Sequence, residues 1–213
     1  MSLKKLVSII SALVFFMLSC SNKNAVRARR SFCDTVCMSD SLKFFDNNNR
    51  LHPYVFISAK DCTGDTLTWG YEGQNKNIQF NYKLNKDYTR CLIKDTAFAL
   101  LVFNTCDNGR GYFMRFSFGK KASFKKSTSA INNFDPRFSV ADSLLAYTDK
   151  GNLFVEHIPT GKTATLTFGK ILDFDFDAIH ETIDSVNITS SHIWARVKID
   201  GDWKTLEKNI TFQ

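Results

Sequence analysis

The chain has 213 residues, a formal net charge of +7 and 44% hydrophobic residues. This length is enough for one domain with a hydrophobic core. With 20 phenylalanines and 3 prolines, the composition favours a packed, β-rich protein over a disordered chain.

The chain starts with the features of a secretory signal. Lys4 and Lys5 precede an apolar run over residues 6–18, and Ser19 and Cys20 follow it. A basic start, an apolar stretch of about 7–15 residues and a small residue before the cleavage point are typical of such signals. The run is shorter than the roughly 20 apolar residues that span a membrane. We therefore expect residues 1–19 to be a signal peptide.

The stretch Met17-Leu18-Ser19-Cys20 resembles the lipobox of bacterial lipoproteins, in the looser form found in the Bacteroidetes lineage. The resemblance implies that Cys20 carries acyl chains such as palmitate and becomes the membrane-anchored N-terminus. Residues 20–31 are polar and then form a lipidated tether. Ser21 follows the cysteine without an acidic run, which by the same resemblance implies the outer membrane, facing the periplasm. An ordinary signal peptide with an incidental cysteine remains the alternative.

Residues 32–213 are expected to form a single β-rich domain. A short helix is predicted over residues 32–45, ended by the polar run 46–49. Four units follow, each an apolar run, an Asp/Gly turn and a second apolar run, which is typical of β-hairpins. The paired runs are 55–59 with 66–71, 99–105 with 111–118, 144–148 with 152–158, and 192–199 with 203–206.

The turn glycines Gly64, Gly109, Gly151 and Gly201 recur at intervals typical of propeller blades. The third unit, residues 138–168, resembles one blade of the WD40-like repeats of TolB-type periplasmic proteins, which implies a propeller. The same hairpins also fit a sandwich or a lipocalin-like barrel. The predicted fold class is thus all-β, an antiparallel meander of about four hairpin units arranged as a β-sandwich or barrel, or propeller-like.

An exported protein meets an oxidising compartment, where disulfides form. Cys62 and Cys106 both stand where a first strand gives way to its turn, in consecutive units. If those units pack side by side, the two cysteines become neighbours, and a Cys62–Cys106 bridge is predicted. Free buried thiols are the alternative. Cys33 and Cys37 lack a second pair of ligands nearby, so no metal site is expected.

Asp followed by Ser or Thr and an apolar residue occurs six times, more often than the composition predicts. The triplet resembles the O-glycosylation acceptor of exported Bacteroidetes proteins, and the resemblance implies modification of its hydroxyls. Turn chemistry at strand entries explains the same triplets. The hydroxyl residues are Thr35, Ser41, Thr66, Thr96, Ser143 and Ser185.

Other candidate chemistry is sparse. Asp173, Asp175 and Asp177 alternate with phenylalanines, so in a strand their carboxylates share one face, as a Ca²⁺ site or as the solvated side of a half-buried strand. The four histidines lie in separate segments, and no nucleophile elbow, phosphate loop or zinc-binding helix occurs. The lysines of 120–126 fit a protected hairpin edge better than a nucleic-acid site.

These observations favour an envelope lipoprotein that acts as a non-catalytic binding or assembly module facing the periplasm. Its expected partners are the membrane, through the lipid anchor, and an unknown protein or glycan, but no nucleic acid. No cofactor and no catalytic residue are expected. A small envelope glycan hydrolase and a lipocalin-like carrier of an apolar ligand remain alternatives, so enzymatic activity stays uncertain.

Overall fold

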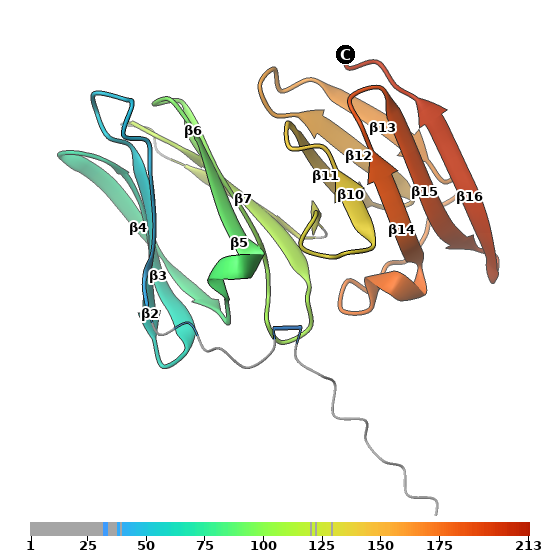
Figure 1. Ribbon diagram of the computed structural model, residues 1–213, viewed down its shortest axis with the longest axis horizontal. Helices are drawn as coiled ribbons and strands as arrows, with labels where there is room; N and C mark the ends of the chain where they lie inside the picture. The colour runs from blue at the N-terminus through green and yellow to red at the C-terminus, as the bar shows by residue number, and fades with distance from the viewer. Residues whose placement is uncertain (1–31, 34–37, 39, 120, 122, 129) are drawn as a thin grey trace, which may run out of the picture.

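The computed structural model describes residues 32–33, 38, 40–119, 121, 123–128 and 130–213, and these are mostly β-structure. They form sixteen strands, with two short 3-10 helices between them. The strands make four sheets of four strands each (Figure 1). The prediction of an all-β fold built from about four antiparallel units is therefore confirmed.

The first two sheets are simple meanders in which each strand pairs antiparallel with the next. Sheet one contains β1 (Leu42–Phe45), β2 (Tyr54–Lys60), β3 (Thr63–Tyr71) and β4 (Gln74–Tyr82). The helix η1 (Lys86–Tyr88) leads to sheet two, with β5 (Thr89–Lys94), β6 (Phe98–Asn104), β7 (Gly111–Ser117) and β8 (Phe124–Thr128).

The last two sheets are linked, because one strand interrupts the chain order of sheet three and pairs within sheet four. Sheet three contains β9 (Ala130–Ile131), β11 (Leu144–Asp149), β12 (Asn152–His157) and β13 (Thr163–Thr167). Sheet four contains β10 (Phe138–Val140), β14 (Ile183–Ile188), β15 (His192–Ile199) and β16 (Asp202–Asn209), with η2 (Ile179–Glu181) before β14. The strand β10 lies between β9 and β11 in the chain but pairs in parallel with β14, so it ties the two sheets together.

The four predicted hairpins are present as β2–β3, β6–β7, β11–β12 and β15–β16. Three of them turn through consecutive residues with positive φ: Asp61-Cys62 (48° and 66°), Lys150-Gly151 (45° and 90°) and Asp200-Gly201 (58° and 88°). Such turns match the right-handed twist of the flanking strands. Gly64, which was predicted as a turn glycine, instead lies buried in β3, because Asp61 and Cys62 form the β2–β3 turn. The Asp/Gly signal placed the other three turns, because the chemistry of a tight turn is local.

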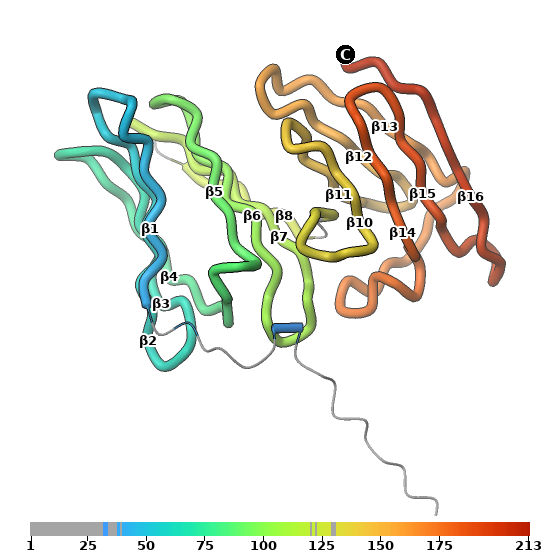
Figure 2. The backbone as a smooth tube through the Cα atoms, in the orientation of Figure 1, coloured from blue at the N-terminus to red at the C-terminus, as the bar shows by residue number. Residues whose placement is uncertain are grey.

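The sheets stack face to face in chain order, as the tube in Figure 2 shows. Strand β6 illustrates the arrangement, because it is buried on both sides. Leu101 and Phe103 belong to the core between sheets one and two, whereas Leu100 and Val102 belong to the core between sheets two and three. Successive residues of a strand point to opposite faces, so one continuous apolar run serves both cores.

The three cores differ in size. The described buried residues number nineteen between sheets three and four, thirteen between sheets one and two, and five between sheets two and three. None of the four described sheets closes on itself, so the arrangement is a stack of open sheets like a β-sandwich and not a barrel. The outer faces of sheets one and four have no further described sheet against them.

The N-terminal expectations have mixed outcomes. The helix predicted over residues 32–45 is wrong for residues 42–45, which form β1. Leu42 and Phe44 pack against the core, whereas Phe45 is exposed. This alternation has the period of two that is typical of a strand, not the period of 3.6 that is typical of a helix. The signal peptide, Cys20 and most of the tether lie outside the described residues. Among the residues described, no helix is long and apolar enough to cross a membrane.

Candidate functional site

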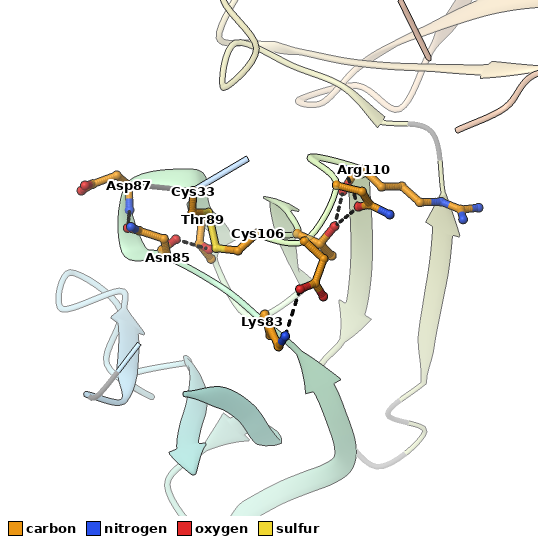
Figure 3. Close-up of a disulfide and its surroundings, with 10 residues drawn as sticks. Cys33, Lys83, Asn85, Asp87, Thr89, Cys106 and Arg110 are labelled. Carbon is orange, nitrogen blue, oxygen red and sulfur yellow. Dashed lines mark hydrogen bonds and ion pairs between the residues drawn. A yellow bond between two sulfur atoms is a disulfide. The ribbon is translucent and has the colours of Figure 1, made fainter. Parts of the chain in front are cut away.

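The disulfide seen in the structure joins Cys106 to Cys33, not to Cys62 (Figure 3). The backbone N–H of Phe32 donates to the carbonyl of Cys106 at 2.8 Å, so the segment before β1 runs beside the β6–β7 turn. Phe32 packs there over Gly109, where a Cβ would lie 2.5 Å from its ring. Cys62 is also disulfide-bonded. The predicted Cys62–Cys106 bridge is therefore wrong, because it assumed that only neighbouring hairpins bring their turns together.

Polar contacts surround this disulfide. Lys83 pairs with Asp107 at 3.1 Å, and the Lys83 carbonyl accepts from the N–H of Cys106 at 2.9 Å. On the opposite side of the turn, Arg110 pairs with Asp177 at 3.3 Å. The Arg110 guanidinium also lies 5.4 Å from the centre of the Phe176 ring. The β6–β7 turn thus holds the N-terminal segment on one side and the loop before β14 on the other.

A second contact joins two loops of the C-terminal half. His180 Nε2 lies 2.6 Å from Asp135 Oδ2, and its Nδ1 lies 3.2 Å from the Ile183 carbonyl. The hydrogen bond to Asp135 raises the pKa of His180, against the opposing effects of burial and of Arg137. Burial acts to raise the pKa of Asp135, but the hydrogen bonds from His180 and from the Arg137 backbone hold it below its usual value. With both ring nitrogens engaged, this histidine is a structural residue.

The acidic run 173–177 is not a strand. Asp175 accepts hydrogen bonds from the N–H groups of Asp177 and Ala178, which makes a turn, and Phe174 is buried in the core between sheets three and four. The three carboxylates Asp173, Asp175 and Asp177 are exposed, as the alternation suggested, but Asp177 is used by Arg110. In the described part of the chain, no group of three or more His, Cys, Asp or Glu is placed to hold a metal ion.

The candidate O-glycosylation residues lie in several environments. Ser41 and Ser143 are exposed, and Thr96 is half-buried in the β5–β6 turn. Thr66 and Ser185 lie within strands, and each hydroxyl donates to the preceding aspartate, Asp65 at 2.9 Å and Asp184 at 3.0 Å. Thr35 lies outside the described residues. Glycosylation at the six positions stays a prediction.

The strongest candidate for a binding surface is the outer face of sheet one. Val55, Ile57 and Leu67 point into the core, so the alternate residues of β2 and β3 point away from it. Strand pairing places Tyr54 opposite Phe45, Phe56 opposite Lys43 and Thr68, and Thr68 opposite Asn77. We define the outer face by these rows and the adjacent one: Lys43, Phe45, Tyr54, Phe56, Ser58, Thr66, Thr68, Asn77 and Gln79.

This outer face has an aromatic side and an amide side. Phe45 is 55% exposed and its ring centre lies 6.4 Å from that of Tyr54. Lys43 places its ammonium 5.6 Å from the centre of the Phe56 ring. Across the threonines, Asn77 and Gln79 are exposed on β4. The face thus combines the exposed Phe45 ring, one ammonium and uncharged hydrogen-bonding groups, a combination that suits recognition.

A cleft of about 370 Å³ lies nearby, where the β3–β4 hairpin faces the end of β7. Trp69 forms part of its wall and donates from its indole N–H to the Ser117 carbonyl at 3.1 Å, which ties sheet one to sheet two. The lining residues are Trp69, Gly70, Gly73, Gln74, Asn75, Lys76, Phe118 and Gly119. None of these eight is a carboxylate or a histidine, and Lys76 is the one charged residue among them.

Cys91 is the free thiol among the described cysteines. It packs against the core between sheets one and two, and burial raises its pKa to about 12. A thiol that stays protonated is a poor nucleophile, so Cys91 serves packing.

The outer face of sheet one was not among the sites predicted from the sequence. The alternation in residues 54–60 and the uncharged run Asn77–Gln79 were available as signals. Alternation alone, however, does not tell which end of a stack of sheets stays uncovered.

No protein-family model, curated protein or solved structure matches this chain.

Proposed function

We propose that this protein is a lipid-anchored module of the bacterial outer membrane that binds a partner on the periplasmic side without converting it chemically. The anchor rests on the lipobox-like stretch that ends at Cys20. The tether then holds the stacked sheets close to the membrane surface, where a binding domain meets envelope polymers and proteins.

The observation that carries the binding role is the outer face of sheet one. It presents exposed Phe45 beside Tyr54, with amides across the sheet, and no described sheet packs on it. An exposed aromatic cluster rimmed by polar groups marks an interaction site. The ionisable pairs Arg110–Asp177 and Asp135–His180, which lie in the other sheets' loops, are engaged in joining those loops.

The anchoring step predicts that acylation depends on Cys20. Full-length protein expressed in bacteria fed labelled palmitate should incorporate the label and fractionate with the outer membrane. Cys20→Ala should lose the label and appear in the soluble fraction, because multiple acyl chains hold firmly whereas one chain holds marginally. Cys91→Ala is the matched control and should be labelled like the native chain. Unchanged labelling of Cys20→Ala would refute the lipoprotein proposal.

A further inference from the structure

We infer that the outer face of sheet one binds a neutral oligosaccharide. This inference rests on the proposed binding function and names its ligand class and its site. Three properties of the face carry it: the rings on one side, the amides and hydroxyls on the other, and the near absence of charge.

The aromatic side offers stacking surfaces. Phe45, Tyr54 and Phe56 lie on two adjacent strands, and Phe45 and Tyr54 are directly paired across them. The C–H faces of pyranose rings are apolar, and they pack against aromatic rings that keep one face free. Phe45, at 55% exposure, keeps more surface free than any other described phenylalanine.

The amide side offers hydrogen bonds of the kind that sugar hydroxyls need. Asn77 and Gln79 each carry two donors and an acceptor, and Thr68 adds a hydroxyl beside them. The side chain of Asn77 makes no hydrogen bond with another described residue, so its capacity is available. An amide that both donates and accepts matches a hydroxyl without favouring a charged group.

Charge separates this ligand class from the others. Lys43 is the one charged residue among the nine of the face, and it lies against the Phe56 ring. A nucleic acid or an acidic glycan requires several cations. A protein partner would be expected to bury an apolar centre, whereas in the middle row of this face the Lys43 ammonium lies over the half-buried Phe56 ring and the polar Thr68 follows. The outer face of sheet four, by contrast, carries Arg196 and Lys198.

The dimensions fit a short chain rather than a single sugar. Strands in a sheet lie about 4.8 Å apart, so the four strands from β1 to β4 span about 14 Å. A chain lying across the strands would contact the rings over β1 and β2 and the amides over β4. Affinity should therefore rise with oligosaccharide length until the face is covered.

The test uses the full-length chain in detergent micelles and isothermal titration with cellohexaose, xylohexaose and mannohexaose, with hexagalacturonate as the acidic comparison. We expect at least one neutral hexasaccharide to bind and hexagalacturonate not to bind. Tyr54→Ala should weaken binding by about tenfold, whereas Tyr54→Phe, which keeps the ring, should bind almost like the native chain. Asn77→Ala, at an exposed position, tests the amide side without disturbing packing. Trp203→Ala on sheet four is the matched control.

The outcomes separate this inference from the proposed function. Failure of all three neutral hexasaccharides to bind, or preference for hexagalacturonate, would overturn the ligand class. Binding that Tyr54→Ala and Asn77→Ala leave unchanged but Trp203→Ala removes would overturn the site while the binding function stands. Release of shorter oligosaccharides during the titration would overturn the proposed non-catalytic function itself.

Discussion

The Asp135–His180 hydrogen bond joins two loops that are distant in the sequence. Asp135 belongs to the loop between β9 and β10, and His180 belongs to η2, forty-five residues later in the chain. His180 also lies 5.1 Å, centre to centre, from the Phe138 ring on β10. The pair therefore holds the start of the exchanged strand against the loop that leads into β14.

This contact predicts a specific pH dependence of stability. Because the folded-state pKa of His180 is raised, its contribution is complete below the unfolded value near 6.5 and is lost as pH rises through the folded value. Because the folded-state pKa of Asp135 is lowered, its contribution is present above 3.8 and is lost as pH falls through the folded value. The urea midpoint should therefore fall as pH rises above about 6.5.

His180→Gln should lack most of that alkaline fall, because glutamine does not titrate. His192→Gln, at an exposed pair with Glu207, is the control and should keep it. Equilibrium urea unfolding at several pH values measures both variants. A His180→Gln midpoint that falls as steeply as the native one would show that other groups produce the dependence.

Individual site residues were hard to predict because their partners are distant in the sequence. The pairing of Arg110 with Asp177 joins residues 67 positions apart, and nothing in either local stretch indicates the other. The alternation at Asp173–Asp177 did identify exposed carboxylates. It could not show that Phe174 enters a core from a turn rather than from a strand.

At the scale of elements, tight turns were the reliable part of the prediction. The β11–β12 turn needs Gly151 for two reasons: its φ is +90°, and a Cβ would lie 2.0 Å from the Lys170 carbonyl oxygen. The turn after β12 uses Gly161 at φ +70°, where the space around a Cβ is open. Substitutions at the two glycines therefore distinguish the cost of backbone strain alone from the cost of strain together with a steric clash.

Gly151→Ala should lower the free energy of unfolding by about 3 kcal/mol or more, since strain and a backbone clash add. Gly161→Ala should cost about 1 kcal/mol, from the positive φ alone. Thermal and urea unfolding of the two variants measure the difference. Equal losses would mean that the chain at Lys170 moves aside easily.

The Cys33–Cys106 bond closes a loop across 73 residues and attaches the segment before β1 to sheet two. In the chain-entropy model, a loop of that length stabilises the folded state by about 4 kcal/mol. The double variant Cys33→Ala, Cys106→Ala should lose stability of that order in urea unfolding. Cys91→Ala is the control and should lose about 1 kcal/mol, as for a small buried side chain. A double variant as stable as the control would indicate that the bond forms without constraining the unfolded chain.

This bond was predicted wrongly because hairpin signals describe only neighbours in the chain. Turn residues establish that β2–β3 and β6–β7 exist, and the structure confirms both. They carry no information on which segment passes beside the β6–β7 turn. The exchange of β10 into sheet four was missed for the same reason, since a three-residue strand leaves little pattern.

At the scale of the whole molecule, the stacking of four sheets buries three cores between them and leaves the outer faces of sheets one and four without another described sheet against them. The middle core is the smallest, and polar contacts border it, including Arg115 with Glu156 and Lys94 with the Pro159 carbonyl. The two end faces differ, because sheet four carries charged residues outward whereas sheet one carries rings and amides. This asymmetry is the reason for proposing that sheet one, and not sheet four, binds the partner.

The central claim is that sheet one binds a partner in the envelope through its outer face. The most direct measurement places a photoreactive benzoylphenylalanine at Asn75 of the full-length chain in living bacteria. Asn75 is exposed on β4 in the row of Tyr54 but is not one of the nine residues of the face. A second strain carries the photoreactive residue at Thr205, which is exposed on sheet four. Ultraviolet light should yield a crosslinked, glycan-containing product from position 75 and none from position 205. Crosslinking from position 205 with none from position 75 would contradict the account.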